Sequence, residues 1–253
     1  MTAQSSASNS AGAVGWLYTR PAFGRTGRVV TENNFAKERR SWIAILLREL
    51  LQNALDARAA AGQPVRVRVA EIVVPESEAA FIDGLIPADH LERFRLSVPH
   101  VQDPPSTIRR FLVLEDFGTT GLIGETENPD LDGKGQNWNA FWFREGEGSK
   151  EHGAGNGGAG QGKITYFSTS AVRTIFAYTV RQNGASEALY GASSFLRDYE
   201  YQSKKWLRDS YWGITRKHGD ATISIPTADS RLRKVCKIDP RPACPGPVLR
   251  ATM

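Results

Sequence analysis

The chain has few cysteines and no long apolar run. Its 253 residues include two cysteines, Cys236 and Cys244, and neither has a nearby histidine that would complete a zinc cluster. We interpret both as unpaired thiols in a reducing compartment. No apolar run approaches the roughly 18 residues of a membrane span, which argues against a membrane partner. The first dozen residues lack the basic start and apolar core of a secretory signal, so we expect a cytoplasmic location.

The charge balance gives only a weak indication of a partner. The net charge is +5 and the isoelectric point is near 9.3, but the basic residues are spread along the chain. A nucleic acid or another acidic partner is therefore compatible with the composition without being required by it. The densest run of aromatic and basic residues is Arg197–Lys217. We expect this run to form an edge hairpin whose long side chains cover apolar surface.

The most informative stretch is a predicted helix over residues 41–61. No glycine or proline interrupts it, Ser41 can cap its start, and Gly62 and Pro64 follow its end. One arc of the helix, which would pack against a sheet, holds Ile43, Leu46, Leu47, Leu50, Ala54 and Ala57. Its polar residues Glu49, Asn53 and Asp56 share a separate face. Such a face is commonly only solvated, but two carboxylates and an amide could also hold a hydrated metal and a water.

A second stretch combines a buried strand with an acidic turn. Residues 111–115 form a continuous apolar run that ends in Glu115, and the chain then reads Asp-Phe-Gly-Thr-Thr-Gly from Asp116 to Gly121. Ligands gather at the carboxyl ends of strands, where an aspartate can accept a hydrogen bond from an exocyclic amine. The alternative is an ordinary turn after a strand, because aspartate and glycine are common turn residues.

A third stretch is a glycine-rich box, residues 153–163, that ends in Gly162 and Lys163 and leads into a short predicted helix. Glycines before a helix present backbone N–H groups to an anion, and Lys150 and Lys163 add positive charge, so phosphate is the expected guest. The box does not match the P-loop spacing. A flexible linker is the alternative interpretation.

The remaining sequence suggests one main domain with two tails. We expect an N-terminal arm over residues 1–34, partly disordered, a domain over 35–230, and a tail or linker over 231–253, where proline is too frequent for a sheet. Residues 75–107 hold five prolines and are predicted to be an insertion with at most one short helix near 87–95. The predicted strands cover residues 65–69, 111–115, 173–180, 188–196, 211–215 and 221–225.

Taken together, the three stretches resemble the boxes of the GHKL ATPase superfamily, and most closely its prokaryotic MORC-like and heat-shock-chaperone-like members. The resemblance covers roughly residues 35–225. It implies a Bergerat fold, which is an α/β (α+β) two-layer sandwich with a mixed, mostly antiparallel sheet covered by helices on one face. It also implies that ATP is bound together with Mg²⁺.

The resemblance implies a role for each matching residue. Glu49 would be the base that orients the attacking water, Asn53 the magnesium ligand, and Asp56 a support for the helix and the phosphates. The adenine would meet Asp116, Gly118, Thr120 and Gly121, with Thr120 standing where many relatives have a second glycine. The phosphates would be wrapped by Lys150, Gly158, Gly160, Gln161, Gly162 and Lys163. Thr222 would match a threonine that reaches the adenine pocket.

The implied function is ATP binding with Mg²⁺-dependent hydrolysis, slow in the isolated domain, by a switch that forms a homodimer when nucleotide binds. Residues 122–162 would be a lid over the triphosphate, and DNA or an effector protein is a further possible partner, as in DNA-directed or antiviral systems. Two alternatives stay open. One is a nucleotide-sensing module without turnover, and the other is a phosphotransferase of the histidine-kinase type, which none of the four histidines supports by its sequence context.

Overall fold

The computed structural model describes residues 12–22, 42–98, 106–128, 135–143, 162–181, 187–237 and 247–252. The strands are β1 (Val14–Tyr18), β2 (Arg66–Val73), β3 (Arg110–Phe117), β4 (Thr174–Val180), β5 (Glu187–Ser194), β6 (Tyr199–Tyr201), β7 (Lys204–Trp206), β8 (Asp209–His218), β9 (Ala221–Ile225) and β10 (Pro247–Thr252). The helices are α2 (Trp42–Asp56), the 3₁₀ turn η1 (Glu76–Glu78), α3 (Ala79–Leu85), α4 (Ala88–Ser97), α5 (Asn137–Trp142), α6 (Gly162–Ser168) and α7 (Arg231–Val235).

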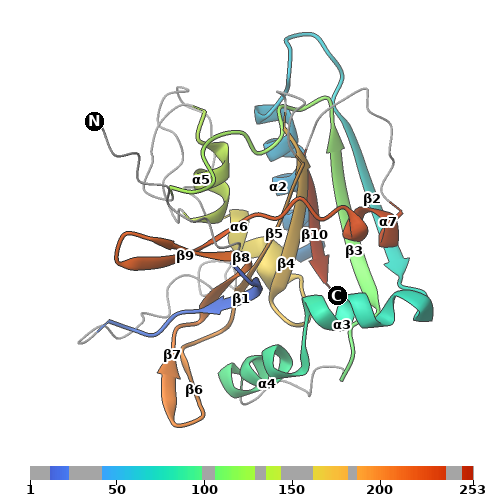
Figure 1. Ribbon diagram of the computed structural model, residues 1–253. Helices are drawn as coiled ribbons and strands as arrows, with labels where there is room; N and C mark the ends of the chain where they lie inside the picture. The colour runs from blue at the N-terminus through green and yellow to red at the C-terminus, as the bar shows by residue number, and fades with distance from the viewer. Residues whose placement is uncertain are drawn as a thin grey trace, which may run out of the picture.

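One large sheet organises these elements (Figure 1). Its strand order is β1-β8-β5-β4-β10-β3-β2, and β9 pairs with β8. Each of the predicted strands is present, with its ends shifted by a few residues. Every pairing among the described strands is antiparallel, whereas the resemblance implied a mixed sheet. The chain is therefore an α+β protein built on an antiparallel sheet.

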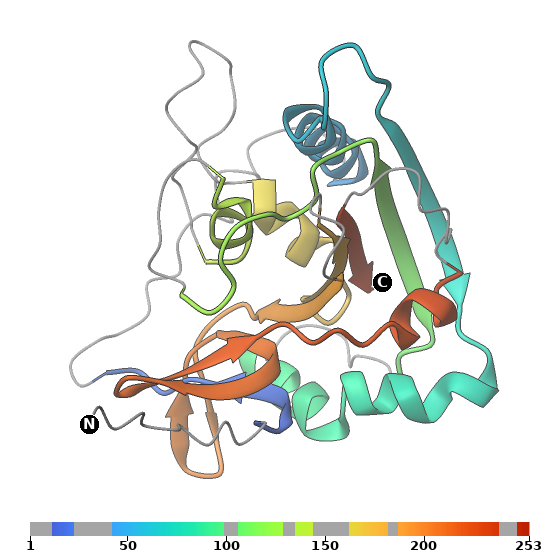
Figure 2. The same cartoon turned by 45° about the horizontal axis from the view of Figure 1, so that its top comes forward.

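The central strands are buried on both faces, because helices cover the sheet from both sides. Along β3, Phe111 and Val113 point into one apolar cluster and Leu114 points into the other, as the two-residue period of a strand requires. One cluster includes side chains from α3, α4 and α7, and the other includes side chains from α2, α5 and α6. Figure 2 shows these two groups of helices on opposite sides of the central strands. The expectation of helices on one face alone is therefore wrong.

Residues 75–107 contribute more structure than their prolines suggested. Instead of at most one short helix, the described part forms η1, α3 and α4. Ala79, Ile82 and Leu85 are buried at a spacing of three residues, which places them on one face of α3. Pro87 precedes the first residue of α4, where its missing N–H costs nothing. This insertion supplies the helical layer on the second face of the sheet.

Both predicted tails enter the sheet. Within the N-terminal arm, Val14–Tyr18 forms β1 and pairs with β8 of the same chain. Within the predicted C-terminal tail, α7 buries Leu232 and Val235, and Pro247–Thr252 forms β10 between β3 and β4. Proline is tolerated there because Pro247 is the first residue of its strand. The boundaries at residues 34 and 231 therefore do not separate tails from the folded part.

The basic aromatic run does form a hairpin, made by β6 and β7. Its rings pack inward on a cation from the insertion. The guanidinium of Arg93 lies 4.0 Å from the ring centroids of Tyr18 and Tyr201 and 4.8 Å from that of Trp206. These contacts stabilise the hairpin against α4.

Among the described residues, no helix is long and apolar enough to cross a membrane.

Two glycines that face each other across β1 and β8 test the packing of this edge of the sheet. Gly15 and Gly213 are cross-strand partners. A Cβ on Gly213 would lie 2.2 Å from the carbonyl oxygen of Ile225, whereas a Cβ on Gly15 would meet nothing within 4 Å. We expect Gly213→Ala to lower the free energy of unfolding by about 1–3 kcal/mol and the matched control Gly15→Ala to change it by less than about 0.5 kcal/mol. Denaturant unfolding measures both, and equal effects would contradict the β8–β9 pairing.

Candidate functional site

The C-terminal end of α2 is fastened to the loop that follows β3. The N–H of Ala59 donates to the carbonyl of Gly118 at 2.9 Å, and the N–H of Thr120 donates to the carbonyl of Ala57 at 2.8 Å. Arg58 and Thr119 form an isolated bridge between the same two segments. The helix therefore ends at Asp56, earlier than the predicted residue 61, because the chain leaves it to pair with this loop. The pairing brings the first two informative stretches of the sequence together.

The polar face of α2 is divided between the interior and solvent. The Asn53 side-chain amide donates to the phenolic oxygen of Tyr166 in α6 at 3.2 Å, and it also bonds to Glu49. Glu49 is half-buried, and burial raises the pKa of its carboxyl group, an effect that the bond from Asn53 partly offsets. Asp56 is exposed. Two members of the predicted triad thus face the protein, and the third faces solvent.

Asp116 lies near the end of β3 and is almost completely buried, with 3% of its surface exposed. Burial raises the pKa of its carboxyl group to about 7, against a smaller opposing effect from the hydroxyl of Thr119, which donates to it at 3.1 Å. A buried carboxyl group whose pKa is close to neutral is a recurring feature of functional sites. It is also a cost that an ordinary turn would avoid.

Tyr166 joins Asp116 to the pair on α2. Burial raises the pKa of its phenol, the bond from Asn53 opposes this, and the charges of Glu49 and Asp116 raise it further. One polar cluster therefore lies inside the apolar layer that contains Leu50 and Leu114. It consists of the phenol of Tyr166, the carboxyl groups of Asp116 and Glu49, and the amide of Asn53. The sequence analysis did not select Tyr166. Its only sequence signal is its place in the short helix that follows the glycine box.

The glycines of the loop have a structural reason to be glycine. Gly118 and Gly121 have φ values of +80° and +71°, a region that L side chains rarely adopt. A Cβ on Gly118 would lie 2.6 Å from the carbonyl oxygen of Pro64, and one on Gly121 would lie 2.6 Å from that of Val180. Protein backbone fills the space that a side chain would need. The two glycines therefore fit the ordinary-turn interpretation as well as the interpretation in which a base approaches the backbone.

Thr179 of β4 is a second residue that the sequence analysis did not select. It is fully buried, and its hydroxyl accepts a hydrogen bond from the N–H of Leu122 at 3.1 Å. Pro247 of β10 is the register partner of Thr179, and its neighbour Val248 pairs with Glu115 beside Asp116. Thr179 therefore fixes the chain directly after Gly121. Within the loop, the Thr120 side chain is half-buried and donates to the carbonyl of Gly121 at 3.3 Å.

Two other predicted residues lie elsewhere. Thr222 is exposed on β9, which pairs with β8, and the chain just after β9 bridges to β5 through Thr227 and Leu189. Among the described strands, β9 pairs with neither β3 nor β10, so the place of Thr222 in an adenine pocket stays a prediction. Lys163 of α6 donates from Nζ to the carbonyl of Trp142 at 3.1 Å and lines a cavity between α5, α6, β5 and β8. Gly162 begins α6, while Lys150, Gly158, Gly160 and Gln161 lie outside the described residues.

The aromatic part of the predicted lid is already packed against the sheet. Trp138 and Trp142 of α5 are buried, with ring centroids 5.3 Å and 5.0 Å from that of Tyr190 in β5. This segment therefore finds its apolar surface within the chain and needs no partner to supply one. Of the predicted lid, the described parts are residues 122–128, 135–143 and 162.

Comparisons of the chain with protein-family models, with curated proteins and with solved structures find no match. A function must therefore be inferred from the residues themselves. Among the described residues, no group of three or more histidine, cysteine, aspartate and glutamate side chains could hold a metal ion. The site offers instead a buried acid, a half-buried acid, an amide and a phenol.

The raised pKa of Asp116 predicts how stability depends on pH. The folded chain keeps the proton up to pH about 7, whereas the unfolded chain loses it near the ordinary value of 3.8. Because the unfolded state binds fewer protons between these values, the group's contribution to stability is complete at low pH and is lost as pH rises. Relative to Asp116→Asn, which cannot ionise, the wild-type free energy of unfolding should fall by about 2–3 kcal/mol from pH 5 to pH 8. Denaturant titrations at both values test this, and a constant difference would contradict it.

Proposed function

We propose that the chain binds ATP through the cluster formed by α2, α6 and the end of β3, and that it hydrolyses the nucleotide with Mg²⁺. The observation that carries the proposal is the burial of Asp116 in the layer of Tyr166, whose phenolic oxygen accepts a hydrogen bond from Asn53 and whose pKa both Asp116 and Glu49 raise. The GHKL-like order of the three sequence boxes supports the same assignment. It explains why an acid is kept at a buried position, where it costs stability.

Each residue of the cluster suits one part of this chemistry. Asp116 would accept a hydrogen bond from the exocyclic amine of adenine, which compensates the buried carboxylate when it is ionised. The Asn53 nitrogen faces Tyr166 and Glu49, so its oxygen is the atom that would take the cation. Mg²⁺ commonly uses few protein ligands and completes its shell with phosphates and waters. The lack of a carboxylate cluster among the described residues is in keeping with this.

Glu49 is the proposed general base. Burial raises the pKa of its carboxyl group, which makes it a better proton acceptor for a water that attacks the γ-phosphate. The bond from Asn53 orients the carboxylate and couples the base to the metal ligand. Under this assignment, loss of the Glu49 carboxylate lowers the rate of turnover far more than it lowers the affinity for nucleotide.

The outer face of α2 supports the proposal of a nucleotide-dependent homodimer. Ile43, Leu47, Leu51 and Leu55 recur every four residues and are between 37% and 67% exposed. The prediction that Ile43 and Leu47 pack against the sheet is therefore wrong. An exposed apolar row of this kind is typical of an interaction surface. The same helix carries Glu49 and Asn53, so a ligand that fixes α2 also fixes this row. DNA or an effector protein stays a possible further partner through the resemblance alone.

Substitutions on α2 separate binding from hydrolysis. Glu49→Ala should keep ATP binding and lower turnover about a hundredfold or more, because it removes a proton acceptor and no metal ligand. Asn53→Ala should weaken ATP binding in the presence of Mg²⁺ and change metal-free binding little. The control is Glu92→Gln, which alters an exposed acid on α4, on the other face of the sheet.

Phosphate release and calorimetric titration measure these two effects. If Glu49→Ala hydrolyses ATP at the wild-type rate, the base is wrongly assigned. If the wild-type chain binds ATP but does not hydrolyse it, the chain is a nucleotide-sensing module. Sedimentation of Glu49→Ala with ATP, which it should hold unhydrolysed, tests the homodimer. Leu51→Lys on the exposed row should abolish that association.

Asp116 should determine the choice of base. ATP should bind more tightly than GTP, because guanine places a carbonyl where adenine has an amine. Asp116→Asn should weaken ATP binding at pH 8 by about 1–3 kcal/mol and affect GTP less. Thermal unfolding of the variant beside the wild type separates a loss of affinity from a loss of folding. Equal wild-type affinities for ATP and GTP in a calorimetric titration would reject the base pocket.

A further inference from the structure

A cavity of about 270 Å³ lies between α5, α6, β5 and β8, away from the polar cluster around Asp116. The cavity lies against only one face of the short helix α6. Lys163 and Phe167, one turn apart, line the cavity, whereas Tyr166 faces α2 and bonds to Asn53. The proposed nucleotide site uses none of the arginines or rings of this cavity.

Among the described residues, those that line the cavity carry more positive than negative groups. Lys163, Arg173 and Arg208 contribute three cationic groups, and Asp209 contributes one carboxylate, which accepts from Nε of Arg208 at 3.4 Å. Ser193 and Ser194 of β5 are the neutral polar residues of the wall. The excess of cationic groups favours an anion, and guanidinium groups suit carboxylate and phosphate oxygens because they offer paired N–H donors.

Arg173 is held toward the cavity by its backbone. Its φ of +49° is uncommon for a residue with a side chain, and it comes directly before β4. Its Nε donates to the carbonyl of Ser194 at 2.6 Å, while its own carbonyl accepts from the N–H of Ser194 at 3.1 Å. These bonds fix the guanidinium at the wall. A non-glycine residue in this conformation is a feature that functional sites often contain.

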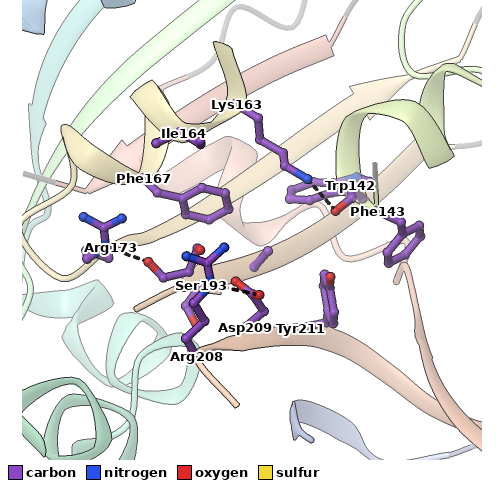
Figure 3. A pocket seen from close by; sticks show the side chains of 12 residues that line it. Trp142, Phe143, Lys163, Ile164, Phe167, Arg173, Ser193, Arg208, Asp209 and Tyr211 are labelled. Carbon is purple, nitrogen blue, oxygen red and sulfur yellow. Dashed lines mark hydrogen bonds and ion pairs between the residues drawn. The ribbon is translucent and has the colours of Figure 1, made fainter. Parts of the chain in front are cut away.

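The rest of the wall is aromatic. Trp142, Phe143, Phe167 and Tyr211 line the cavity, and the ring centroids of Phe143 and Tyr211 are 5.3 Å apart. In Figure 3 the guanidinium groups of Arg173 and Arg208 lie to one side of the cavity, and Trp142, Phe143 and Tyr211 lie to the other. The two arginines therefore mark one end of the wall, and the rings mark the other, where Nζ of Lys163 lies against the carbonyl of Trp142.

We propose that this cavity is a second binding site, for a small molecule that joins an anionic group to a flat ring. The anionic group would lie at Arg173 and Arg208, and the ring would lie against Phe143 and Tyr211. The cavity is at the lower end of the size range of small-molecule pockets, so it suits a single ring with one charged group and excludes a nucleoside triphosphate. This site does not depend on whether the Asp116 cluster binds ATP.

Ligand-observed NMR titrations of the whole chain with four probes test the proposal. Phenyl phosphate and benzoate carry both features, inorganic phosphate carries only the charge, and phenol carries only the ring. Phenyl phosphate or benzoate should bind about tenfold or more tightly than either single-feature probe, as expected when a charge-assisted hydrogen bond and ring burial add together. The stronger of the two identifies the anionic group as a phosphate or a carboxylate.

Variants place the binding in the cavity. Arg208→Gln should weaken the best probe about tenfold, the loss expected for one charge-assisted bond. The matched control is Arg216→Gln on β8, the strand that begins directly after Arg208; this arginine pairs with Glu127 away from the cavity. Arg173→Gln replaces Arg208→Gln if thermal unfolding shows that the first variant does not fold.

The proposal is overturned if the two-feature probes bind no better than phosphate or phenol, or if the arginine variants bind like Arg216→Gln. Saturating ATP with Mg²⁺ should change the affinity for the best probe by no more than about twofold, because the two ligands contact different faces of α6. Displacement by ATP would overturn the assignment of a separate site. Failure of ATP to bind anywhere would reject the proposed function and leave this site intact.

Discussion

Two backbone hydrogen bonds hold the candidate site together, one from Ala59 to Gly118 and one from Thr120 to Ala57. They fasten the end of α2 to the loop after β3, two segments that lie about sixty residues apart in the chain. Together with the packing of Leu50 in the layer of Leu114 and Tyr166, they keep Asp116 on the same side of the sheet as Asn53 and Tyr166. The positive φ of Gly118 and the early end of α2 both serve this pairing.

Burial then gives the fastened residues their chemical character. Asp116 lies in the same layer as Leu114 and Leu50, where the apolar surroundings raise its pKa to about 7. The neighbouring Glu115 alternates to the other face of β3 and bonds to Arg68, and its other carboxylate oxygen has no partner among the described residues. Adjacent acids on one strand thus meet different surroundings. Asp116, which has no cationic partner among the described residues, is the acid whose charge raises the pKa of Tyr166.

The short helix α6 is a wall shared by both proposed sites. Tyr166 belongs to the polar cluster with Asn53, while Lys163 and Phe167 belong to the cationic cavity. Although the helix spans only seven residues, its two faces carry different side chains, so each proposed site has its own lining.

By itself, the sequence determined the elements whose signals are local. The 3.6-residue period predicted α2, the apolar runs predicted β3 and β4, and the polar face of α2 placed Glu49 and Asn53 together. Long-range packing decided what a local pattern cannot contain. Helix packing on the sheet decided the second helical layer, the bond between Tyr166 and Asn53, and the place of Lys163 in the cavity wall. Strand order decided the insertion of β10 between β3 and β4 and the place of Thr222 on β9 beside β8. Strand order is set by which surfaces bury one another across the whole chain, so only the tertiary structure reveals it.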